Sequence, residues 1–150
     1  MDDLDISILR ELQAHPTLSA EEVSRRVGLS HTPCWRRIRK LEAEGYILDR
    51  AVILNPDKLN LRLTVFASVR LKQHDPGTLE AIESSARKCP EIVECYSMTG
   101  EGDYIFRILI SDVPAYEKFL KTTLLNFPGV AAINSSVALK QIKLTTKIPL

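Results

Sequence analysis

The strongest constraint on the fold is a set of helix boundary signals near the start of the chain. Ser19 and Glu22 are spaced as a capping box, in which each side chain bonds the backbone N–H of the other residue. Leu18 and Val23 flank this box as a hydrophobic staple, and Gly28 is suited to end a short helix. Only the residues of "GLS" then precede the next helical pattern. Two helices joined by so short a turn are typical of a helix-turn-helix unit.

The helix that follows this turn is predicted to be amphipathic. Thr32 and Pro33 suit its first turn, because proline lacks an N–H that would have no partner there. Either Ser30 or Thr32 can be its N-cap, and Gly45 is a suitable stop. At a spacing of about 100° per residue, one side forms a buried seam of Cys34, Ile38 and Leu41. We expect the thiol in this seam to be a core group rather than a redox sensor.

Positive charge is concentrated in this region. The 18 residues from Ser24 to Leu41 contain six cations and no acidic residue. This window carries +6, whereas the whole chain carries +1 at pH 7, so the other residues together carry −5. A generally basic nucleic-acid coat is therefore excluded, and a local basic patch is predicted. Charge alone is equally consistent with a solvated surface, but the helix signals around it favour a recognition helix that binds double-stranded DNA.

The exposed side of the predicted recognition helix has residues suited to bases and to phosphates. Arginine can bind guanine through two hydrogen bonds in the major groove, and a helix N-terminus attracts phosphate. We assign base contacts to His31, Thr32 and Arg36, and phosphate contacts to Arg25, Arg26, Arg37, Arg39 and Lys40. Ser30, Pro33 and Trp35 complete the DNA-binding set. Trp35 is expected to pack mainly against its own domain rather than insert into DNA.

A first helix and a connecting strand complete the N-terminal half. Asp2 and Asp3 can cap a helix whose apolar positions are Leu4, Ile8, Leu9 and Leu12 and which ends at His15-Pro16. Residues 46–54 alternate in polarity and predict a strand, and residues 55–62 form a polar turn. We therefore expect a winged helix-turn-helix DNA-binding domain over residues 1–54, a linker over residues 55–62 and a second domain over residues 63–150.

The second domain is predicted to contain one strand–helix–strand unit twice. The first unit has an alternating strand at Val65, Ala67, Val69 and Leu71, a helix from Thr78, and a strand from "CPEIVEC" to about Thr99. The second unit has the strand "DYIFRILI", a helix after Asp112-Val113-Pro114 and a last strand from "FPGVAAI". "DYIFRILI" is apolar on both faces, so it should be a central strand. The order βαββαβ predicts an α+β, ferredoxin-like fold.

Two helices on one face of such a sheet leave its other face open. An apolar open face usually pairs with a second subunit, so we expect a homodimer with two-fold symmetry.

The segment "SMTGEGDYIF" joins the two units and is a candidate ligand site. Gly100 and Gly102 allow positive φ and a close approach of the backbone. Glu101 and Asp103 are carboxylates that can meet an ammonium group, and the N–H groups of the turn can meet a carboxylate. Together they suit a zwitterion such as an amino acid. The alternative is an ordinary glycine-containing hairpin without a ligand.

Several classes of protein are excluded or disfavoured. No apolar run is long enough to span a membrane, and "MDDLDIS" does not resemble a signal peptide. The three cysteines contain no C-x-x-C pair, which favours a reduced cytoplasmic protein without a structural metal. The three histidines lie in unrelated segments, and no hydrolase, Walker or dinucleotide motif is present. We therefore expect no enzymatic activity and no cofactor.

Five segments together resemble the Lrp/AsnC (feast/famine) family of transcriptional regulators. They are "LDISILRELQ", "LSAEEVSRRVGLSHTPCWRRIRKLEAEGYI", "NPDKLNL", "TGEGDY" and "NSSVALKQIKLTT", and they span nearly the whole chain. The resemblance implies a winged helix-turn-helix joined to an amino-acid-sensing ferredoxin-like domain. It also implies dimers that assemble into octamers or similar rings and bind amino acids between dimers. The "TPCWRRIRKLE" and "GEGDY" matches are the more specific ones. The "TPCW" start and the "SSVALKQIKLTT" ending are most similar to a branch associated with sulfur amino acids.

The resemblance also implies which residues bind the effector. The effector positions of the family fall on Thr99, Gly100, Glu101, Gly102, Asp103 and Tyr104, with Asp103 the most prominent. Others fall on Ser135, Ser136 and Val137 of a neighbouring subunit. Two rival functions are an architectural DNA-binding protein without ligand control and a metabolic amino-acid-binding module. Equal affinity for all DNA sequences would favour the first, and turnover of a bound amino acid would favour an enzymatic form of the second.

Overall fold

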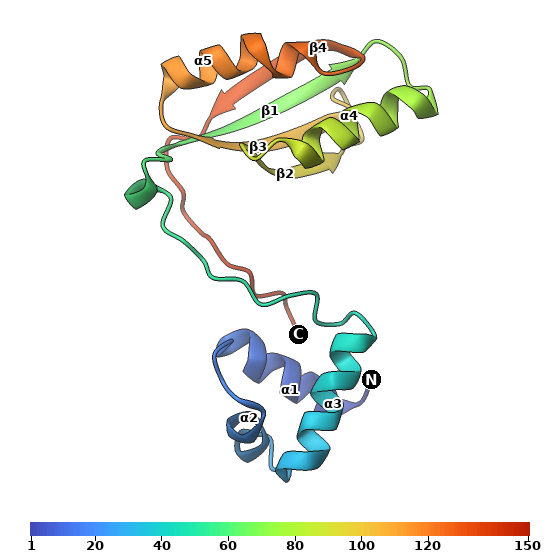
Figure 1. Ribbon diagram of the computed structural model, residues 1–150, viewed down its shortest axis with the longest axis vertical. Coiled ribbons are helices and arrows are strands. Elements are labelled where there is room, and N and C mark those ends of the chain that lie inside the picture. The colour runs from blue at the N-terminus through green and yellow to red at the C-terminus, as the bar shows by residue number, and fades with distance from the viewer. The chain divides into compact units, whose positions relative to one another are not determined.

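The computed structural model describes residues 1–150, which form two compact units (Figure 1). Residues Met1–Ile53 and Ile142–Leu150 form the first unit, and residues Leu54–Gln141 form the second. Each unit has a separate buried apolar core.

The first unit is built on three helices, α1 (Asp3–Ala14), α2 (Ala20–Arg26) and α3 (His31–Ala43). The predicted capping box is confirmed, since Ser19 Oγ accepts the Glu22 N–H at 3.3 Å and Glu22 Oε2 accepts the Ser19 N–H at 2.8 Å. Gly28 and Gly45 have φ values of 70° and 76°, which let the chain turn sharply after α2 and α3. These boundaries confirm the predicted helix-turn-helix arrangement.

The capping box gives the first testable prediction. Ser19→Ala is expected to lower the free energy of unfolding by about 1 kcal/mol, because the Glu22 N–H in the first turn of α2 loses its acceptor. Denaturant unfolding followed by circular dichroism measures this change. Ser30→Ala is the matched control, since Ser30 occupies the N-cap position of α3 without a side-chain hydrogen bond. Equal losses in the two variants would contradict this description of α2.

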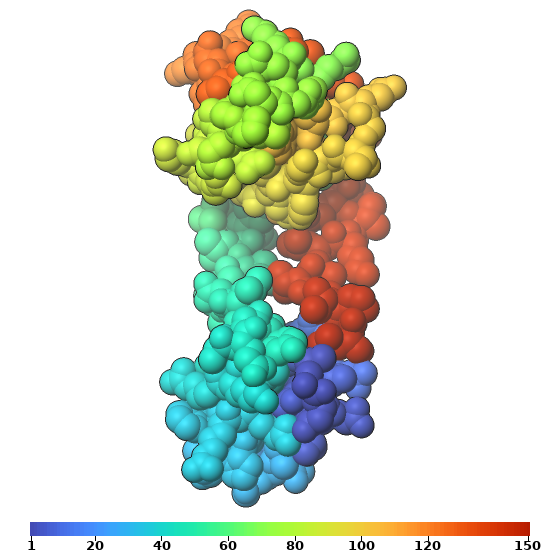
Figure 2. Space-filling view, turned by 90° about the vertical axis from the view of Figure 1, so that its right-hand side faces the viewer, coloured from blue at the N-terminus to red at the C-terminus, as the bar shows by residue number.

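The apolar sides of the three helices meet in one core. Its buried residues are Ile8, Leu12, Val23, Cys34, Ile38 and Leu41. The seam predicted for α3 is confirmed, because its three residues are the only buried ones on that helix. The rest of α3 remains exposed or half-buried, and its light-blue to cyan atoms form much of the surface of this unit (Figure 2).

The strand predicted over residues 46–54 is wrong for this chain. Residues 47–55 have no regular secondary structure, and Leu48 and Val52 are largely exposed. Alternating polarity is typical of a strand, but a strand also requires a hydrogen-bonded neighbour. No other segment of the chain pairs with this one, since the only sheet contains four strands of the second unit.

The end of the chain is attached to α1. Gln13 Nε2 donates to the Ile148 carbonyl at 3.0 Å, and Gln13 Oε1 accepts the Ile148 N–H at 2.7 Å. Arg10 Nε donates to the Leu150 carbonyl at 3.3 Å. Figure 2 shows the red atoms of this tail beside the dark-blue atoms of α1. The last residues, which the sequence groups with the second domain, therefore belong to the first unit in the structure.

The second unit has the predicted order of elements. These are β1 (Leu63–Leu71), α4 (Pro76–Lys88), β2 (Ile92–Ser97), β3 (Tyr104–Ile110), α5 (Val113–Thr122) and β4 (Val130–Val137). The strands form one antiparallel sheet in the order β2-β3-β1-β4. This topology is the ferredoxin-like fold, and β3 is a central strand as its apolar sequence predicts.

Both helices cover the same face of this sheet. Alternate residues of β1 and β3 are buried, and they share one core with Ile82 of α4 and Tyr116 of α5. Tyr104 of β3 pairs with Val69 of β1, which pairs with Ile133 of β4, so these three residues form one row across the sheet. The positions of the candidate ligand residues on β3 and β4 can be compared relative to this row.

The opposite face of the sheet is only partly apolar. Phe66 and Ile105 alternate with the helix-facing residues and therefore lie on this open face. Arg107 lies opposite Phe66 in the register and forms an ion pair of 2.7 Å with Glu94 of β2. The apolar open face expected from the sequence is thus interrupted by a charged pair.

Candidate nucleic-acid interface and effector loop

The exposed side of α3 presents two adjacent ridges of side chains. Residues four positions apart lie on the same side of a helix. One ridge consists of His31, Trp35 and Arg39, and the other consists of Thr32, Arg36 and Lys40. All six side chains are exposed, and none belongs to the buried seam. The structure thus brings all the predicted base-contact residues onto one surface.

The N-terminus of α3 has free hydrogen-bond donors. Ser30 is the N-cap residue, which resolves the choice between Ser30 and Thr32, but it makes no side-chain cap hydrogen bond. The first N–H groups of an α-helix have no intrahelical acceptor. Those of α3 are therefore left for an anion, and the helix dipole adds partial positive charge at the same end.

Four of the predicted phosphate-binding residues form ion pairs at the protein surface. The pairs are Arg25 with Glu21, Arg26 with Glu11 at 3.1 Å, Arg39 with Glu42 at 3.1 Å, and Lys40 with Glu44 at 3.8 Å. Exposed pairs of this kind contribute only about 0–1 kcal/mol. A phosphate can therefore replace the carboxylate at little cost.

Arg36 differs from the other cations of this surface. Its side chain is exposed on α3 and forms neither an ion pair nor a hydrogen bond within the chain. Its guanidinium donors are all available for a ligand. This is the property required of a side chain that reads a base edge.

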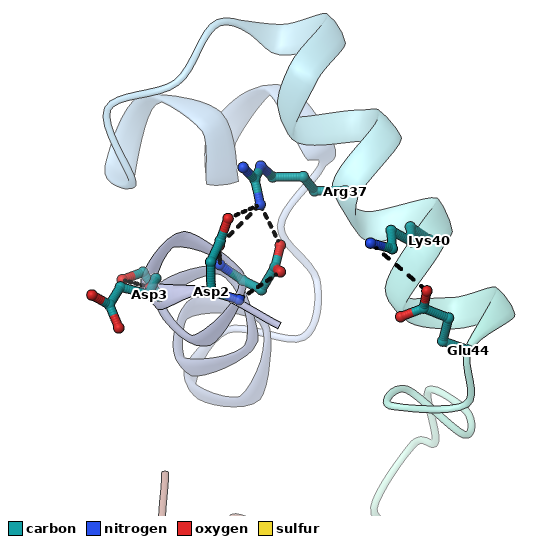
Figure 3. A network of polar contacts seen from close by, with 7 residues as sticks. Asp2, Asp3, Arg37, Lys40 and Glu44 are labelled. Atoms are coloured by element: carbon teal, nitrogen blue, oxygen red, sulfur yellow. Dashed lines mark hydrogen bonds and ion pairs between the residues drawn. The ribbon is translucent and has the colours of Figure 1, made fainter.

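Arg37 binds two carboxylates of its own domain and is therefore not free for the predicted phosphate contact. Its Nη1 donates to Asp5 Oδ1 at 2.7 Å and to the two carboxylate oxygens of Asp2 at 2.8 and 2.9 Å (Figure 3). The Asp5 N–H and then Arg37 hold the pKa of Asp2 below its ordinary value. Asp5 is buried, so this network ties α3 to the start of α1. The assignment of Arg37 to phosphate is corrected accordingly.

The candidate effector loop, residues 99–104, is closed by Asp103. Its N–H donates to the Val69 carbonyl at 2.8 Å, and its carbonyl accepts the Met98 N–H at 2.8 Å. Its carboxylate accepts the Leu71 N–H at 2.7 Å and contacts His74 Nε2 at 2.7 Å. The Leu71 N–H and then His74 hold the pKa of Asp103 below its ordinary value, so this carboxylate is an anion at neutral pH.

His74 is the neighbour that sequence reasoning missed. It lies 29 residues before Asp103, in the turn after β1. No periodicity or motif in the sequence connects the two residues. The pairing arises only because β1 and β3 are neighbours in the sheet.

The two glycines of this loop serve different purposes. Gly100 has a φ of 108°, a conformation that residues with a side chain rarely adopt. A Cβ added to Gly102 would lie 2.3 Å from Ser68 Oγ, so a larger residue would require the Ser68 hydroxyl to rotate away. The glycines therefore allow both the shape of the loop and its close approach to the sheet.

The other residues of the loop differ in whether their side chains form hydrogen bonds within the chain. Thr99 and Glu101 are exposed, and their side chains form no hydrogen bond within the chain. Tyr104 is buried, and its hydroxyl donates to Glu83 Oε1 of α4 at 2.8 Å. Burial and then this contact raise the pKa of Tyr104 to about 12. Tyr104 therefore supports the loop from the helix-covered face instead of presenting its hydroxyl to a ligand.

The predicted residues of β4 are not brought to this loop within one chain. Ser135 faces α5, where its Oγ lies 2.6 Å from the Tyr116 hydroxyl, and Ser136 points to the opposite face. Val137 lies four residues beyond Ile133, which shares a row with Tyr104. This spacing corresponds to roughly 13 Å along a strand. Within one chain, Val137 is therefore too far from the loop to share a site with it.

Of a further groove, a metal site and a membrane-spanning helix, the chain contains only a groove. A surface groove of about 470 Å³ lies between α4 and β2 and is lined in part by Glu83, Arg87 and Cys95. No group of three His, Cys, Asp or Glu side chains is placed to hold a metal ion. No helix combines the length and apolar character that a membrane crossing requires.

Comparison with known protein families assigns each unit. Residues 1–47 match the family described as winged helix-turn-helix DNA-binding, and residues 64–148 match the Lrp/AsnC ligand binding domain. The leucine-responsive regulatory protein of Klebsiella pneumoniae is 38% identical over 148 residues, covering 99% of this chain and 90% of that protein. The protein of the same name from Escherichia coli K12 is 37% identical, with the same coverage.

Solved structures give the same assignment. A transcriptional regulator from Neisseria meningitidis in complex with L-Met is 39% identical, with a TM-score of 0.93, over 99% of this chain and 96% of that one. An AsnC family transcriptional regulator from Agrobacterium tumefaciens is 41% identical, also with a TM-score of 0.93, over 99% and 97% of the two chains. The resemblance noted in the sequence is confirmed. The chain belongs to the Lrp/AsnC family of transcriptional regulators and contains both its DNA-binding and its ligand-binding domain.

Proposed function

We propose that this regulator places α3 in the major groove of an operator and that an amino acid at residues 99–104 changes its assembly or DNA affinity. The main support for DNA binding is the guanidinium of Arg36, which has no partner in the chain and projects from an exposed basic face of α3. Residues 1–54 then act as the DNA-binding domain and residues 55–62 as a linker. Residues 63–150 act in effector binding and oligomerisation, and the protein acts in the cytoplasm.

The two ridges of α3 suggest how contacts are divided. Arg36 donates two hydrogen bonds to a guanine, and His31 and Thr32 contact neighbouring base edges. Arg25, Arg26, Arg39 and Lys40 exchange their surface carboxylates for phosphates. Ser30 and Pro33 lie at the helix start, where the backbone N–H groups meet a phosphate. The base contacts give sequence preference, and the phosphate contacts give affinity.

A two-fold dimer has two copies of this surface and can therefore recognise a longer DNA sequence than one copy can. Two copies of α3 in successive major grooves recognise a pseudo-palindrome with half-sites about 10 bp apart, or a multiple of that distance. Phe66 and Ile105 on the open face of the sheet offer apolar area for the dimer contact. Dimers then assemble into an octamer or a similar ring, which bends or bridges DNA.

Binding to two DNA fragments tests the DNA half of the proposal. The purified protein is titrated with duplex from upstream of its own gene and with a random duplex of equal length, at about 150 mM salt. The expected result is at least tenfold tighter binding to the upstream duplex, about 1.4 kcal/mol. Equal affinity for the two duplexes would contradict an operator-specific regulator and favour the architectural alternative.

The effector loop suits the two charged ends of an amino acid. The anionic carboxylate of Asp103 has lone pairs beyond those used by Leu71 and His74, and these can accept an ammonium group. The backbone turn at Gly100, which has a positive φ, offers N–H groups to the carboxylate. Thr99, Glu101 and Gly102 surround these groups, Tyr104 supports them, and Ser135, Ser136 and Val137 are contributed by a neighbouring subunit.

Methionine and leucine are the first amino acids to test. The similar Neisseria meningitidis regulator was solved with L-Met, and the similar enterobacterial proteins are named leucine-responsive. An effector bound between dimers shifts their assembly only by its different affinities for the assembled and separate states.

Asp103→Asn is expected to weaken amino-acid binding by about 10- to 100-fold, or ~1.5–3 kcal/mol, because the ammonium group loses a charged acceptor. The amide oxygen can still accept the Leu71 N–H, so the loop and DNA binding should be retained. Titration calorimetry with methionine and leucine measures the affinity. Glu101→Gln tests the other carboxylate of the same loop, which is exposed and has no partner in the chain, and a larger loss there than in Asp103→Asn would make Glu101 the main ammonium acceptor. Unchanged binding in Asp103→Asn would exclude Asp103 as the ammonium acceptor.

A further inference from the structure

Trp35 is the only tryptophan in the chain, and its side chain is 46% exposed on α3. In a small domain a side chain of this size usually buries most of its area. Trp35 instead lies outside the buried cluster of the first unit. The predicted packing of Trp35 against its own domain is therefore not what the structure contains. Nearly half of the residue's surface is left for contact with another molecule.

Arg39 and Glu42 restrict the position of the indole ring. Arg39 Cζ lies 5.6 Å from the centroid of the Trp35 ring, which is a cation–π distance. The same guanidinium donates to Glu42 Oε2 at 3.1 Å. One face of the ring is thus covered by a cation that is itself held from the next turn of the helix. The rest of the ring projects outward in a partly fixed orientation.

The ridge that contains Trp35 lies directly beside the ridge that contains Arg36. Trp35 and Arg36 are consecutive residues on these two ridges, so a helix lying in the major groove can present them to neighbouring base pairs. The apolar group that base pairs present in the major groove is the 5-methyl group of thymine. An exposed indole therefore has one chemically matched partner among the base edges.

We infer that Trp35 contacts the methyl group of a thymine next to the base pair read by Arg36 and so adds a thymine preference to each half-site. This inference rests on the proposed placement of α3 in the major groove. Burial of one methyl group is worth about a fourfold change in affinity. The indole N–H can alternatively donate to a phosphate, which would give affinity without any thymine preference.

Selection from a random duplex library tests the inference. Wild-type protein and Trp35→Ala are each used to recover bound duplexes, which are sequenced. The wild-type sites are expected to contain a conserved thymine in each half-site, beside the position that Arg36→Ala relaxes. Trp35→Ala should lose this thymine and keep the neighbouring position. Recovery of the same thymine by Trp35→Ala would overturn the inference.

Removal of the methyl group alone provides a second, independent measurement. Replacing the selected thymine by deoxyuridine in one half-site is expected to weaken wild-type binding about fourfold. Trp35→Ala should bind the two duplexes equally, and Trp35→Phe should retain part of the difference, since it keeps an aromatic ring. Equal binding of the two duplexes by wild-type protein would overturn the thymine contact.

The outcomes distinguish this inference from the function on which it rests. A wild-type protein that selects no sequence at all would overturn both. Selection of a defined site that does not change in Trp35→Ala would overturn only the role of Trp35. Because Trp35 is outside the core, Trp35→Ala should unfold at the wild-type temperature, and circular dichroism verifies that any lost preference does not come from lost structure.

Discussion

Arg36→Ala is expected to weaken binding of the operator by about 1–3 kcal/mol per half-site, or ~2–6 kcal/mol for a dimer on a symmetric site. The expected loss is large because a bidentate contact to guanine disappears and the guanine acceptors lose their partner. No part of the loss should come from the fold, since the Arg36 side chain forms no ion pair or hydrogen bond within the chain. Sequence preference at one position of each half-site should be relaxed. Titration of the selected duplex and of single-base variants measures both effects.

Arg36→Lys separates the two possible roles of this residue. Lysine keeps the positive charge but cannot make the planar, two-bond contact of a guanidinium. If Arg36 reads a base, Arg36→Lys should lose most of the preference that Arg36→Ala loses. If the lysine variant binds as wild type, or if Arg36→Ala loses equal affinity for all sequences, Arg36 is a phosphate contact.

Raising the salt concentration from about 50 to about 200 mM is expected to reduce operator affinity roughly 10³-fold. This estimate assumes about three phosphates neutralised by each protomer and therefore about six by a dimer. The structure offers four surface cations for this purpose, each in a weak ion pair that phosphate can displace. Plotting the logarithm of affinity against that of salt concentration gives the number of phosphates directly.

Lys40→Gln provides a control for the salt dependence. It should reduce the slope by about one phosphate per protomer and weaken binding to all sequences alike. A slope near zero for the wild-type protein would contradict the phosphate contacts. A change of base preference in Lys40→Gln would show that the ridge of Thr32, Arg36 and Lys40 is divided differently between bases and phosphates.

The features of the fold that sequence predicts correctly depend on neighbouring residues. Ser19 and Glu22 are three positions apart, and their reciprocal hydrogen bonds form as expected. The seam of α3 follows from helical spacing within a single element. The ferredoxin-like order likewise follows from the succession of strands and helices along the chain.

The features that sequence reasoning missed join distant residues. Arg37 looks like one more cation of a basic helix, yet Asp5 is 32 positions away and takes its guanidinium. Asp103 looks like a free ligand-binding carboxylate, yet Leu71 and His74 occupy much of it. In both cases the folded chain provides a partner that no local spacing indicates.

Dependence on distant partners also explains why the predicted strand is absent and why one chain does not bring all the predicted ligand residues together. Residues 46–54 have the alternation of a strand, but pairing depends on a neighbour that this chain does not supply. Ser135 and Ser136 of β4 lie apart from the loop closed by Asp103 within one chain, so the resemblance, and not the residues themselves, is what predicts that a neighbouring subunit contributes them. Contacts between chains leave no local signal within one sequence.

The most direct test of the central claim measures operator affinity with and without each of the twenty amino acids. The experiment uses the full-length protein and the selected duplex at about 150 mM salt, with Asp103→Asn measured alongside. An effector-responsive regulator predicts that at least one amino acid shifts the affinity at least fivefold, a typical coupling of about 1 kcal/mol, and that Asp103→Asn loses this shift. Operator affinity that no amino acid changes would contradict amino-acid control of DNA binding.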